Sequence, residues 1–409
     1  MEEASMSTAL LYHNYSIRGY RYRSMKKVSG GIEFHIEQAK EQCRCPQCKS
    51  QEISLKGVKT RRFHAPPIGS KHVTIVFNVP RVECRECGTL RQVHISFARP
   101  MRRCIRAFER YILQLLNYMT CKDVAELLGV SWGTIRDVEK DHLSRRYAKP
   151  PLKDVKHIAI DEIAVKKGHK YMTIVLDLDT KQVIFVGDGR GGDSLKPFWK
   201  RLRRSRAEIR AVATDMSPAY VSAVETMLPD AIFVFDRFHI IKLFNDKMTE
   251  LRRRLYRETT EKSTKEALKG SRWILLKRSD NLDPDRGEPA RLAEALERNS
   301  DLSAAYFLKE ELSEIWEQED RDIAEGMLLD WILFAESLEI KELTAFAQTL
   351  RRHAIGILAY YDAEITTGPL EGINNKIKTM KRQSYGFRDQ EYFKLKILSL
   401  HRTRYALLG

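Results

Sequence analysis

The chain has 409 residues, and its 71 Lys and Arg against 55 Asp and Glu give a formal net charge of +16. That length is enough for two or three domains with cores of their own. The start, MEEASMSTALLYHNYS, lacks the apolar core of a secretory signal, and no run approaches the roughly 20 apolar residues of a membrane span. We therefore expect a cytoplasmic protein with no membrane partner, whose cysteines are reduced or metal-bound.

The positive charge is concentrated in the first part of the chain. Residues 1–150 hold 27 Lys and Arg and 14 Asp and Glu, an excess of +13, whereas residues 151–409 hold 44 and 41, an excess of +3. A basic segment binds nucleic acid by neutralising phosphates and releasing their counterions. The alternative is a basic surface that serves solubility alone. The asymmetry favours a polyanion-binding front joined to a different second part.

Five of the seven cysteines lie within the first 87 residues. Four of them form two Cys-x-x-Cys pairs, which are Cys45, Cys48, Cys84 and Cys87. Four thiolates match the tetrahedral site of a structural Zn²⁺, and short strands between two such pairs are typical of a zinc ribbon. The strand-like run 72–83 lies between the pairs, and Cys43 could replace Cys45 as a ligand. The alternative is a set of unligated core cysteines. We predict a zinc-ribbon module over residues 1–100.

A helix-turn-helix is predicted over residues 101–150. Apolar residues recur at helical spacing in 102–120, and 121–143 contains two short helices separated by Gly129. Ser131 can cap the second of these helices. The expected buried face of the first comprises Val124, Leu127 and Leu128. The side chains expected to contact DNA are Trp132, Thr134, Arg136 and Lys140. Any two amphipathic helices around a glycine would give a similar pattern.

The chain from residue 151 to 244 has the element order of a ribonuclease-H-like α/β core. Three strand-like runs at 157–166, 170–179 and 181–189 are joined by short turns and predict an antiparallel meander. A helix at 194–208, a strand at 209–215, a helix at 218–227 and a strand at 231–236 follow. Residues 237–360 are predicted to be almost wholly helical. The whole chain is therefore expected to be a multidomain α+β protein.

The helical stretch is predicted to be an insertion over residues 245–360, after which the core resumes over 361–409. The last helix of a compact core of this type would follow far sooner than the 371 − 215 = 156 residues that separate Asp215 from Glu371. The block 301–350 carries 13 acids against 3 bases, which argues against a main DNA-binding face.

Three acids occupy the positions that a metal-dependent nuclease of this fold requires. Asp161 lies in the first strand, Asp215 follows the fourth strand, and Glu371 opens the last helix. Converging carboxylates can hold two Mg²⁺ or Mn²⁺ ions, which activate a water or a 3′-hydroxyl for attack on a phosphate. The alternative is three ordinary surface acids. Glu162 should point to the opposite face of its strand.

Further residues surround this predicted site. Asp236 and His239 are expected as its neighbours, with His239 contacting a phosphate or packing at a helix start.

The glycines of 187–192 match G-x-G-x-x-G, but they end a hairpin and so lack the context of a dinucleotide site. Arg190 could reach a phosphate from that turn. One exposed stripe is expected along the last helix, formed by Glu371, Asn375, Lys378 and Arg382. Its carboxylate would bind the metal ion, and its amide and basic side chains would bind the DNA backbone. Ile373, Ile377 and Met380 should point to the core.

Together, these parts resemble the DDE transposases of the insertion-sequence ISL-three family. The most specific segments are IAIDE (158–162), ATDMS (213–217), FDRFHIIK (235–242) and the stretch around Glu371. The resemblance implies a catalytic triad of Asp161, Asp215 and Glu371 that cuts DNA and transfers strands. Thr367 stands where family members commonly have Asn.

The resemblance also implies partners. They are double-stranded DNA, as terminal inverted repeats and as target, and a second copy of the chain, because two ends must be joined. A bacterial protein associated with the nucleoid when bound to DNA is expected. Two alternatives are a non-catalytic DNA-binding regulator, which would bind without cutting, and a structure-selective nuclease of the same fold.

Overall fold

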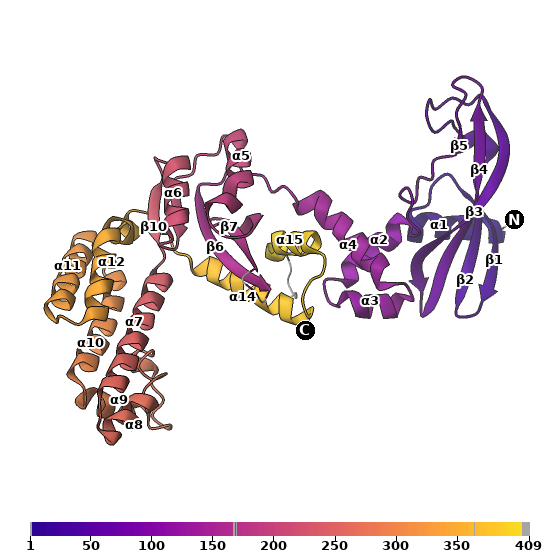
Figure 1. Ribbon diagram of the computed structural model, residues 1–409. Coiled ribbons are helices and arrows are strands. Elements are labelled where there is room, and N and C mark those ends of the chain that lie inside the picture. The colour runs from indigo at the N-terminus through magenta and orange to yellow at the C-terminus, as the bar shows by residue number, and fades with distance from the viewer. Residues whose placement is uncertain (1, 167, 169, 364, 403–409) are drawn as a thin grey trace. The chain divides into compact units, whose positions relative to one another are not determined.

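The computed structural model describes residues 2–166, 168, 170–363 and 365–402, which fall into two compact units on either side of the Arg146–Tyr147 bond (Figure 1). Each unit has its own core and is described separately. None of the helices in the described part of the chain has the length and apolar character needed to cross a membrane.

The first unit contains a five-stranded sheet with the order β1-β2-β4-β3, and β5 pairs with β4. Helix α1 (Glu2–Tyr15) precedes the sheet, and the short helix η1 (Lys40–Gln42) follows its second strand. The strands are β1 (Arg21–Val28), β2 (Gly31–Glu37), β3 (Ile53–Ile68), β4 (Lys71–Cys84) and β5 (Leu90–Gln92). The predicted strand at 72–83 is confirmed as β4. The expectation of short strands is wrong, because β3 and β4 form a hairpin of 16 and 14 residues around a buried aromatic core.

The predicted helix-turn-helix is present as α2 (Arg106–Leu115), α3 (Cys121–Leu128) and α4 (Trp132–Tyr147). Thr120 and Asp123 cap the start of α3 reciprocally, and Gly129 ends it with a φ of 61°. Ser131 accepts a hydrogen bond from the backbone N–H of Thr134 at 3.2 Å, which confirms it as the cap of α4.

The expected buried face of α3 is correct in two of its three residues. Val124 and Leu128 are buried against Ile135 and Val138 of α4. Leu127 is 53% exposed, so its assignment to the buried face is wrong. Only one face of α3 packs against the core, and Leu127 lies on a different face.

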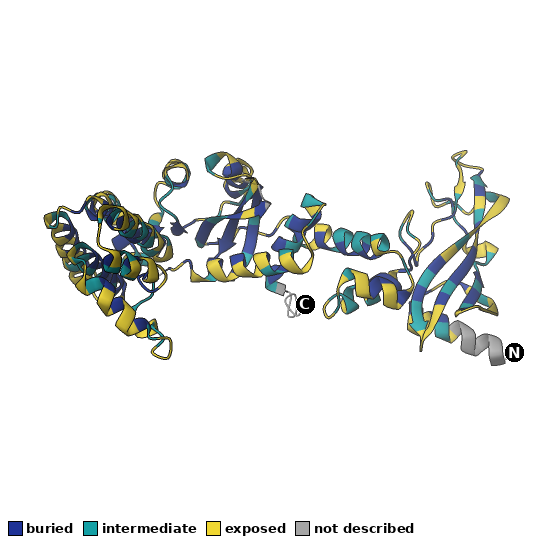
Figure 2. Cartoon of the chain, turned by 60° about the horizontal axis from the view of Figure 1, so that its bottom comes forward, coloured by how far each residue is buried: buried dark blue, intermediate teal, exposed yellow. Residues whose placement is uncertain are grey.

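The second unit is built on a sheet with the order β10-β9-β6-β7-β8. Its strands are β6 (His157–Lys166), β7 (Lys170–Asp177), β8 (Gln182–Asp188), β9 (Ala211–Thr214) and β10 (Ile232–Phe235). The strands β6, β7 and β8 form the predicted antiparallel meander, whereas β9 and β10 run parallel to β6. This is the ribonuclease-H-like arrangement, and its strands are largely buried in Figure 2.

Helices cover both faces of this sheet. Alternate residues of β6 enter two different cores, because side chains alternate across a strand. Ile158 and Ile160 pack with α5 (Lys196–Ser205) and α6 (Pro218–Met227), and the short helix η2 (Gly192–Leu195) leads into α5. Ala159 and Ile163 pack with α14 (Gly368–Gln383) and α15 (Gln390–Leu398), which η5 (Leu400–Arg402) follows.

The predicted helical insertion follows β10 and has a separate hydrophobic core. Its helices are α7 (Arg237–Glu258), α8 (Lys262–Gly270), η3 (Ser279–Asn281), α9 (Glu288–Glu297), α10 (Ser300–Glu314), η4 (Ile315–Glu317), α11 (Arg321–Ser337) and α12 (Lys341–Leu358), before α13 (Tyr360–Ala363). Phe244, Trp331 and Phe346 pack edge to face at its centre. Helix α7 runs without a break out of the core sheet into the insertion.

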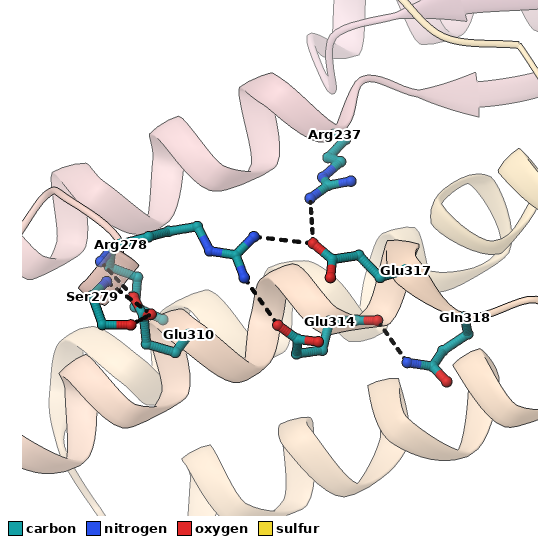
Figure 3. A network of polar contacts seen from close by, with 8 residues as sticks. Arg237, Arg278, Ser279, Glu310, Glu314, Glu317 and Gln318 are labelled. Atoms are coloured by element: carbon teal, nitrogen blue, oxygen red, sulfur yellow. Dashed lines mark hydrogen bonds and ion pairs between the residues drawn. The ribbon is translucent and has the colours of Figure 1, made fainter. Parts of the chain in front are cut away.

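A polar network joins the start of α7 to later segments of the insertion (Figure 3). Glu317 of η4 accepts from Arg278 at 3.0 Å and lies 3.6 Å from Arg237, the first residue of α7. Arg278 also donates to Glu314 at 3.1 Å, and Ser279 donates to Glu310 at 2.9 Å. Shared carboxylates and guanidinium groups thus connect three separate segments beside the end of β10.

Candidate catalytic and zinc sites

The four predicted zinc ligands come together at one end of the long hairpin. Cys45 Sγ lies 3.6 Å from Cys87 Sγ, and Cys48 Sγ lies 3.5 Å from Cys84 Sγ. Four sulfurs around one zinc at 2.3 Å would be about 3.8 Å apart, so the residues fit a tetrahedral ion. Hydrogen bonding to the side chain and backbone of Thr89 lowers the pKa of the Cys87 thiol to about 6, which favours the thiolate that zinc binds.

The alternative ligand Cys43 lies outside this group. Its buried thiol donates to the carbonyl oxygen of Ala39 at 3.7 Å and packs in the core of the first unit. Within the described part of the chain, the four cysteines are the one group of three or more His, Cys, Asp or Glu residues whose ligand atoms all lie within 4.8 Å of one another. Cys45 is therefore the ligand that the geometry selects.

The residues predicted to read DNA lie on the first turns of α4. Trp132 is 49% exposed, and the guanidinium of Arg136 lies 5.2 Å from the centre of its ring. Arg136 also donates to Asp137 at 2.6 Å. Thr134 and Lys140 are half-buried. This helix therefore presents an aromatic ring and a guanidinium side by side.

Strand register brings the first two predicted catalytic acids together. β6 pairs with β9 over three residues, ending at Ala159 opposite Ala213. Continuing both strands by two residues sets Asp161 level with Asp215 on the same face. In the same way, Phe235 pairs with Thr214, so Asp236 follows directly beside Asp215. Asp215 and Asp236 thus follow the carboxyl ends of β9 and β10, the edge at which open α/β sheets bind their ligands, and Asp161 lies level with them in the middle of β6.

The carboxylate of Asp161 is half-buried and is hydrogen-bonded on both oxygens. Its Oδ1 accepts from the backbone N–H of Glu162 at 2.7 Å, and its Oδ2 accepts from Asn374 Nδ2 at 2.6 Å. Burial raises the pKa of Asp161, and the charges of Asp215 and Asp236 raise it further, against the opposing effect of the Glu162 N–H and His239. A divalent cation would relieve this concentration of negative charge.

Glu162 lies on the other face of β6, as predicted. The Tyr220 hydroxyl of α6 donates to its Oε2 at 3.4 Å, within the layer of α5 and α6. Burial raises the pKa of Glu162, and the charge of Asp215 adds to that effect. Asp215 therefore acts electrostatically on both faces of β6, and its own Oδ1 accepts from the backbone N–H of Ser217 at 3.1 Å.

Asp236 and His239 form a hydrogen-bonded pair next to these acids. Asp236 caps α7 through the Phe238 N–H at 2.9 Å, and His239 Nδ1 lies 2.7 Å from its other oxygen. Burial alone would raise the pKa of Asp236, but hydrogen bonds from His239 and Thr367 outweigh it and lower the pKa. The hydrogen bond to Asp236 in turn raises the pKa of His239. Thr367, the residue that departs from the family pattern, therefore supports this pair.

The last predicted acid, Glu371, is exposed in the first turn of α14. The predicted stripe of Glu371, Asn375, Lys378 and Arg382 is exposed along its whole length, and Ile373, Ile377 and Met380 are buried as predicted. Glu371 and Asp236 both line a pocket of about 420 Å³ whose walls include Phe238, Trp316 and Lys309.

Asn374, one turn after Glu371, is a site residue that the sequence reasoning missed. It lies at the helical spacing of the buried residues of α14, so the pattern of the helix assigned that face to the core. Its hydrogen bond to Asp161 joins the helix that carries Glu371 to strand β6. A polar residue within an apolar helical face was the signal that could have identified it.

The donor atoms of the acid site suit Mg²⁺ or Mn²⁺. Both are hard cations that prefer carboxylate and carbonyl oxygens. Asp161 and Asp215 supply carboxylates, and Asn374 Oδ1 is a buried oxygen that has no hydrogen-bond partner among the described residues. Glu371 lines a pocket with Asp236, and the carboxylate oxygens of Asp161, Asp215 and Glu371 do not all lie within 4.8 Å of one another. The residues therefore fit a divalent cation in type.

The glycine-rich turn after β8 has the hairpin context expected of it. Gly187 lies within β8 of the antiparallel meander, one residue before the strand ends, and Gly189 and Gly191 have φ values of 87° and 81° before η2 begins. Arg190 lies 5.2 Å from the Tyr171 ring centre, and its charge lowers the pKa of Glu162.

The fold and these sites define a chain with a zinc ribbon, a helix-turn-helix and a ribonuclease-H-like core with an acidic centre. The model of a family described as "Transposase" (DDE_Tnp_ISL3) matches residues 158–397. Residues 41–87 match the "zinc-finger of transposase IS204/IS1001/IS1096/IS1165", and residues 93–143 match the "Helix-turn-helix domain of transposase family ISL3". The chain therefore belongs to the ISL3 family of transposases.

Relatives with known names support this placement. The chain is 32% identical over 363 residues to the transposase for insertion sequence element IS1001 of Bordetella parapertussis, covering 86% of this chain and 87% of that one. It is 26% identical over 397 residues to the transposase for IS1557 of Mycobacterium tuberculosis, covering 90% and 87%. The Drosophila P element transposase strand transfer complex aligns at a TM-score of 0.39 and 12% identity over 74% and 92%, and no conclusion depends on that weak likeness.

Proposed function

We propose that this chain is a DNA transposase that binds the terminal inverted repeats of its insertion sequence, cuts the DNA strands there and joins them to target DNA. Asp161, Asp215 and Glu371 are the proposed catalytic residues. The observation that supports this proposal is the register of β6 and β9, which, continued by two residues, sets Asp161 level with Asp215, together with the hydrogen bond from Asn374 on the Glu371-bearing helix to Asp161.

Asp161, Asp215 and Glu371 would hold two Mg²⁺ ions, which, when bound, would activate a water or a 3′-hydroxyl and stabilise charge on the phosphate. The residues of the chain position the reactants. His239, kept protonated by Asp236, would donate to a phosphate oxygen. Lys378 and Arg382 on the exposed stripe of α14, with Asn375 and Arg190, would hold the DNA backbone.

Recognition of the ends is assigned to the first unit. Trp132, Thr134, Arg136 and Lys140 of α4 would enter the major groove, as the second helix of a helix-turn-helix does. The zinc site would keep the long hairpin folded beside it. We infer a dimer on DNA, because both ends of the element must be joined in one complex.

The test is incubation of the zinc-loaded protein with DNA carrying one end of its element, with and without Mg²⁺, followed by mapping of the cut positions. Asp161→Asn, Asp215→Asn and Glu371→Gln should each abolish cutting and leave end binding intact. Asp230→Asn, an exposed acid in the link between α6 and β10, should cut as the wild type does.

Three results would change the proposal. Full cutting by one of the three variants would remove that acid from the catalytic set. Specific end binding without any Mg²⁺-dependent cutting by the wild type would make the chain a regulator. Cutting set by DNA structure, without preference for the ends, would make it a structure-selective nuclease.

A further inference from the structure

Asn374 occupies an unusual position in the acid site. It is only 6% exposed, yet it lies on the helical face that otherwise carries Ile373, Ile377 and Met380. Its Nδ2 donates to Asp161 at 2.6 Å. Its Oδ1 is buried and has no hydrogen-bond partner within the described ranges of the chain.

The orientation of this amide follows from chemistry. An ionised carboxylate only accepts hydrogen bonds, so the Asn374 group that faces Asp161 must be the NH₂. The carbonyl oxygen is then directed away from Asp161 and remains unpaired. Buried polar groups are almost always hydrogen-bonded, and an exception at a site of ligand chemistry calls for a functional reason.

We propose that Asn374 is a fourth residue of the cation site. Its Nδ2 fixes the carboxylate of Asp161, and its Oδ1 accepts a hydrogen bond from a water bound to the cation that Asp161 holds. This inference rests on the proposed function. Mg²⁺ keeps several of its waters in protein sites, and groups that hydrogen-bond to ligands or to those waters orient the site.

The position of Asn374 on α14 gives this residue a second effect. Because Glu371 lies one helical turn before it, the bond to Asp161 also fixes the distance from that carboxylate to the start of α14. Asn374 is thus a positioning residue that couples Asp161 of β6 to the acid on α14.

The experiment measures cation binding separately from activity. Zinc-loaded protein without DNA is titrated with Mn²⁺, and the free ion is followed by its electron paramagnetic resonance signal. Asn374→Ala should weaken binding about tenfold or more, the usual effect of losing such a supporting group. The Mg²⁺ concentration needed for half-maximal cutting should rise similarly.

Asn245→Ala is the matched control. Asn245 lies on α7 and also has a buried Oδ1 without a partner in the described structure, but it is bonded to no acid of the site. Its Mn²⁺ binding should equal that of the wild type. Wild-type Mn²⁺ binding and Mg²⁺ dependence in Asn374→Ala would overturn the proposal, as would an equal loss in Asn245→Ala.

Asn374→Asp keeps the test decisive if the alanine variant does not fold. It retains an oxygen acceptor but sets a second carboxylate against Asp161, so Mn²⁺ should raise its Tm more than that of the wild type. An equal or smaller rise would overturn the proposal. Asp161→Asn separates the two levels of inference. Wild-type Mn²⁺ binding by that variant would defeat the proposed function itself, whereas loss there with full binding in Asn374→Ala would defeat the role of Asn374 alone.

Discussion

Replacing Asp161 by Asn should stabilise the protein in the absence of divalent cations while abolishing its activity. In the wild type this half-buried carboxylate faces the charges of Asp215 and Asp236. The amide of Asp161→Asn has nearly the same shape and carries no charge. Its oxygen can still accept from the Glu162 N–H, and rotation of the Asn374 amide preserves the second hydrogen bond.

The size of the effect follows from the removal of a half-buried charge that neighbouring carboxylates repel. Relief of such strain at a functional site is typically worth about 1–2 kcal/mol. The second unit spans residues 147–402. For a domain approaching this size each kcal/mol shifts Tm by about 2–4 °C, so the expected rise in Tm is about 2–8 °C.

The pH dependence has a definite sign. The pKa of Asp161 is raised in the folded protein, so folding is penalised only when this carboxyl is ionised. The penalty is absent below the pKa of the unfolded chain and fully present above that of the folded protein. The advantage of Asp161→Asn should therefore be largest at neutral pH and should disappear as the solution is acidified.

The assay is thermal unfolding of the zinc-loaded proteins across this pH range, with and without Mn²⁺. Added Mn²⁺ should raise the Tm of the wild type and leave that of Asp161→Asn unchanged. Asp230→Asn makes the same chemical change at an exposed site and should stay within about 0.5 kcal/mol of the wild type. A lower Tm for Asp161→Asn at neutral pH would refute the reasoning.

Two further predictions concern stability. Cys84→Ser should abolish bound zinc, measured by elemental analysis, whereas Cys43→Ser should keep one zinc per chain; loss of zinc from the Cys43 variant would contradict the ligand set. A methyl group on Gly356 would lie 2.5 Å from the Phe235 ring, so Gly356→Ala should cost about 1–3 kcal/mol in urea unfolding. Gly326 has open space around it, so Gly326→Ala should not lower the free energy of unfolding. An equal decrease in that variant would show that replacing any helical glycine destabilises the protein, whether or not the new methyl group meets Phe235.

Sequence reasoning succeeded for the sheet and helices of the second unit's core, where apolar residues are concentrated. The predicted helix at 218–227 agrees with α6 residue for residue, and the three strands of the meander were found in order. The helix carries its buried residues on one face, whereas the strands are continuous apolar runs because helices pack on both faces of the sheet. The order of the elements, read with the positions of the acids, was enough to indicate the fold.

The strands of the first unit other than β4 went unrecognised, and two of them are largely exposed. β1 is almost wholly exposed, and its sequence RYRSMKKV therefore has no alternation of apolar and polar residues. The first part of β3 is mostly exposed and carries several basic residues, and two prolines lie near the end of the strand. Both strands exist because β2 and β4 offer them hydrogen-bonding edges. Such pairing depends on neighbours distant in sequence, which periodicity does not record.

The site was predictable only in part for a similar reason. The acids could be located because each stands at the end or within an apolar strand, or at the start of a helix after a Gly-Pro pair. Asn374 could not be separated from Asn375 in this way, because their difference depends on which side of α14 meets β6. The role of the buried Asn374 amide follows only from its hydrogen bond to Asp161, which the sequence does not show.

The long insertion is compatible with one site because both of its ends are fastened beside that site. The chain leaves the sheet at Asp236 through α7 and returns through α12, whose Gly356 packs directly against Phe235 of β10. The entropic cost of closing a loop grows only slowly with its length, and a folded insertion with anchored ends adds less still. The packing of α12 on β10 fixes where the chain re-enters the core, whatever the number of residues in between. Glu371 can therefore follow Asp215 by 156 residues and still lie near the ends of the strands.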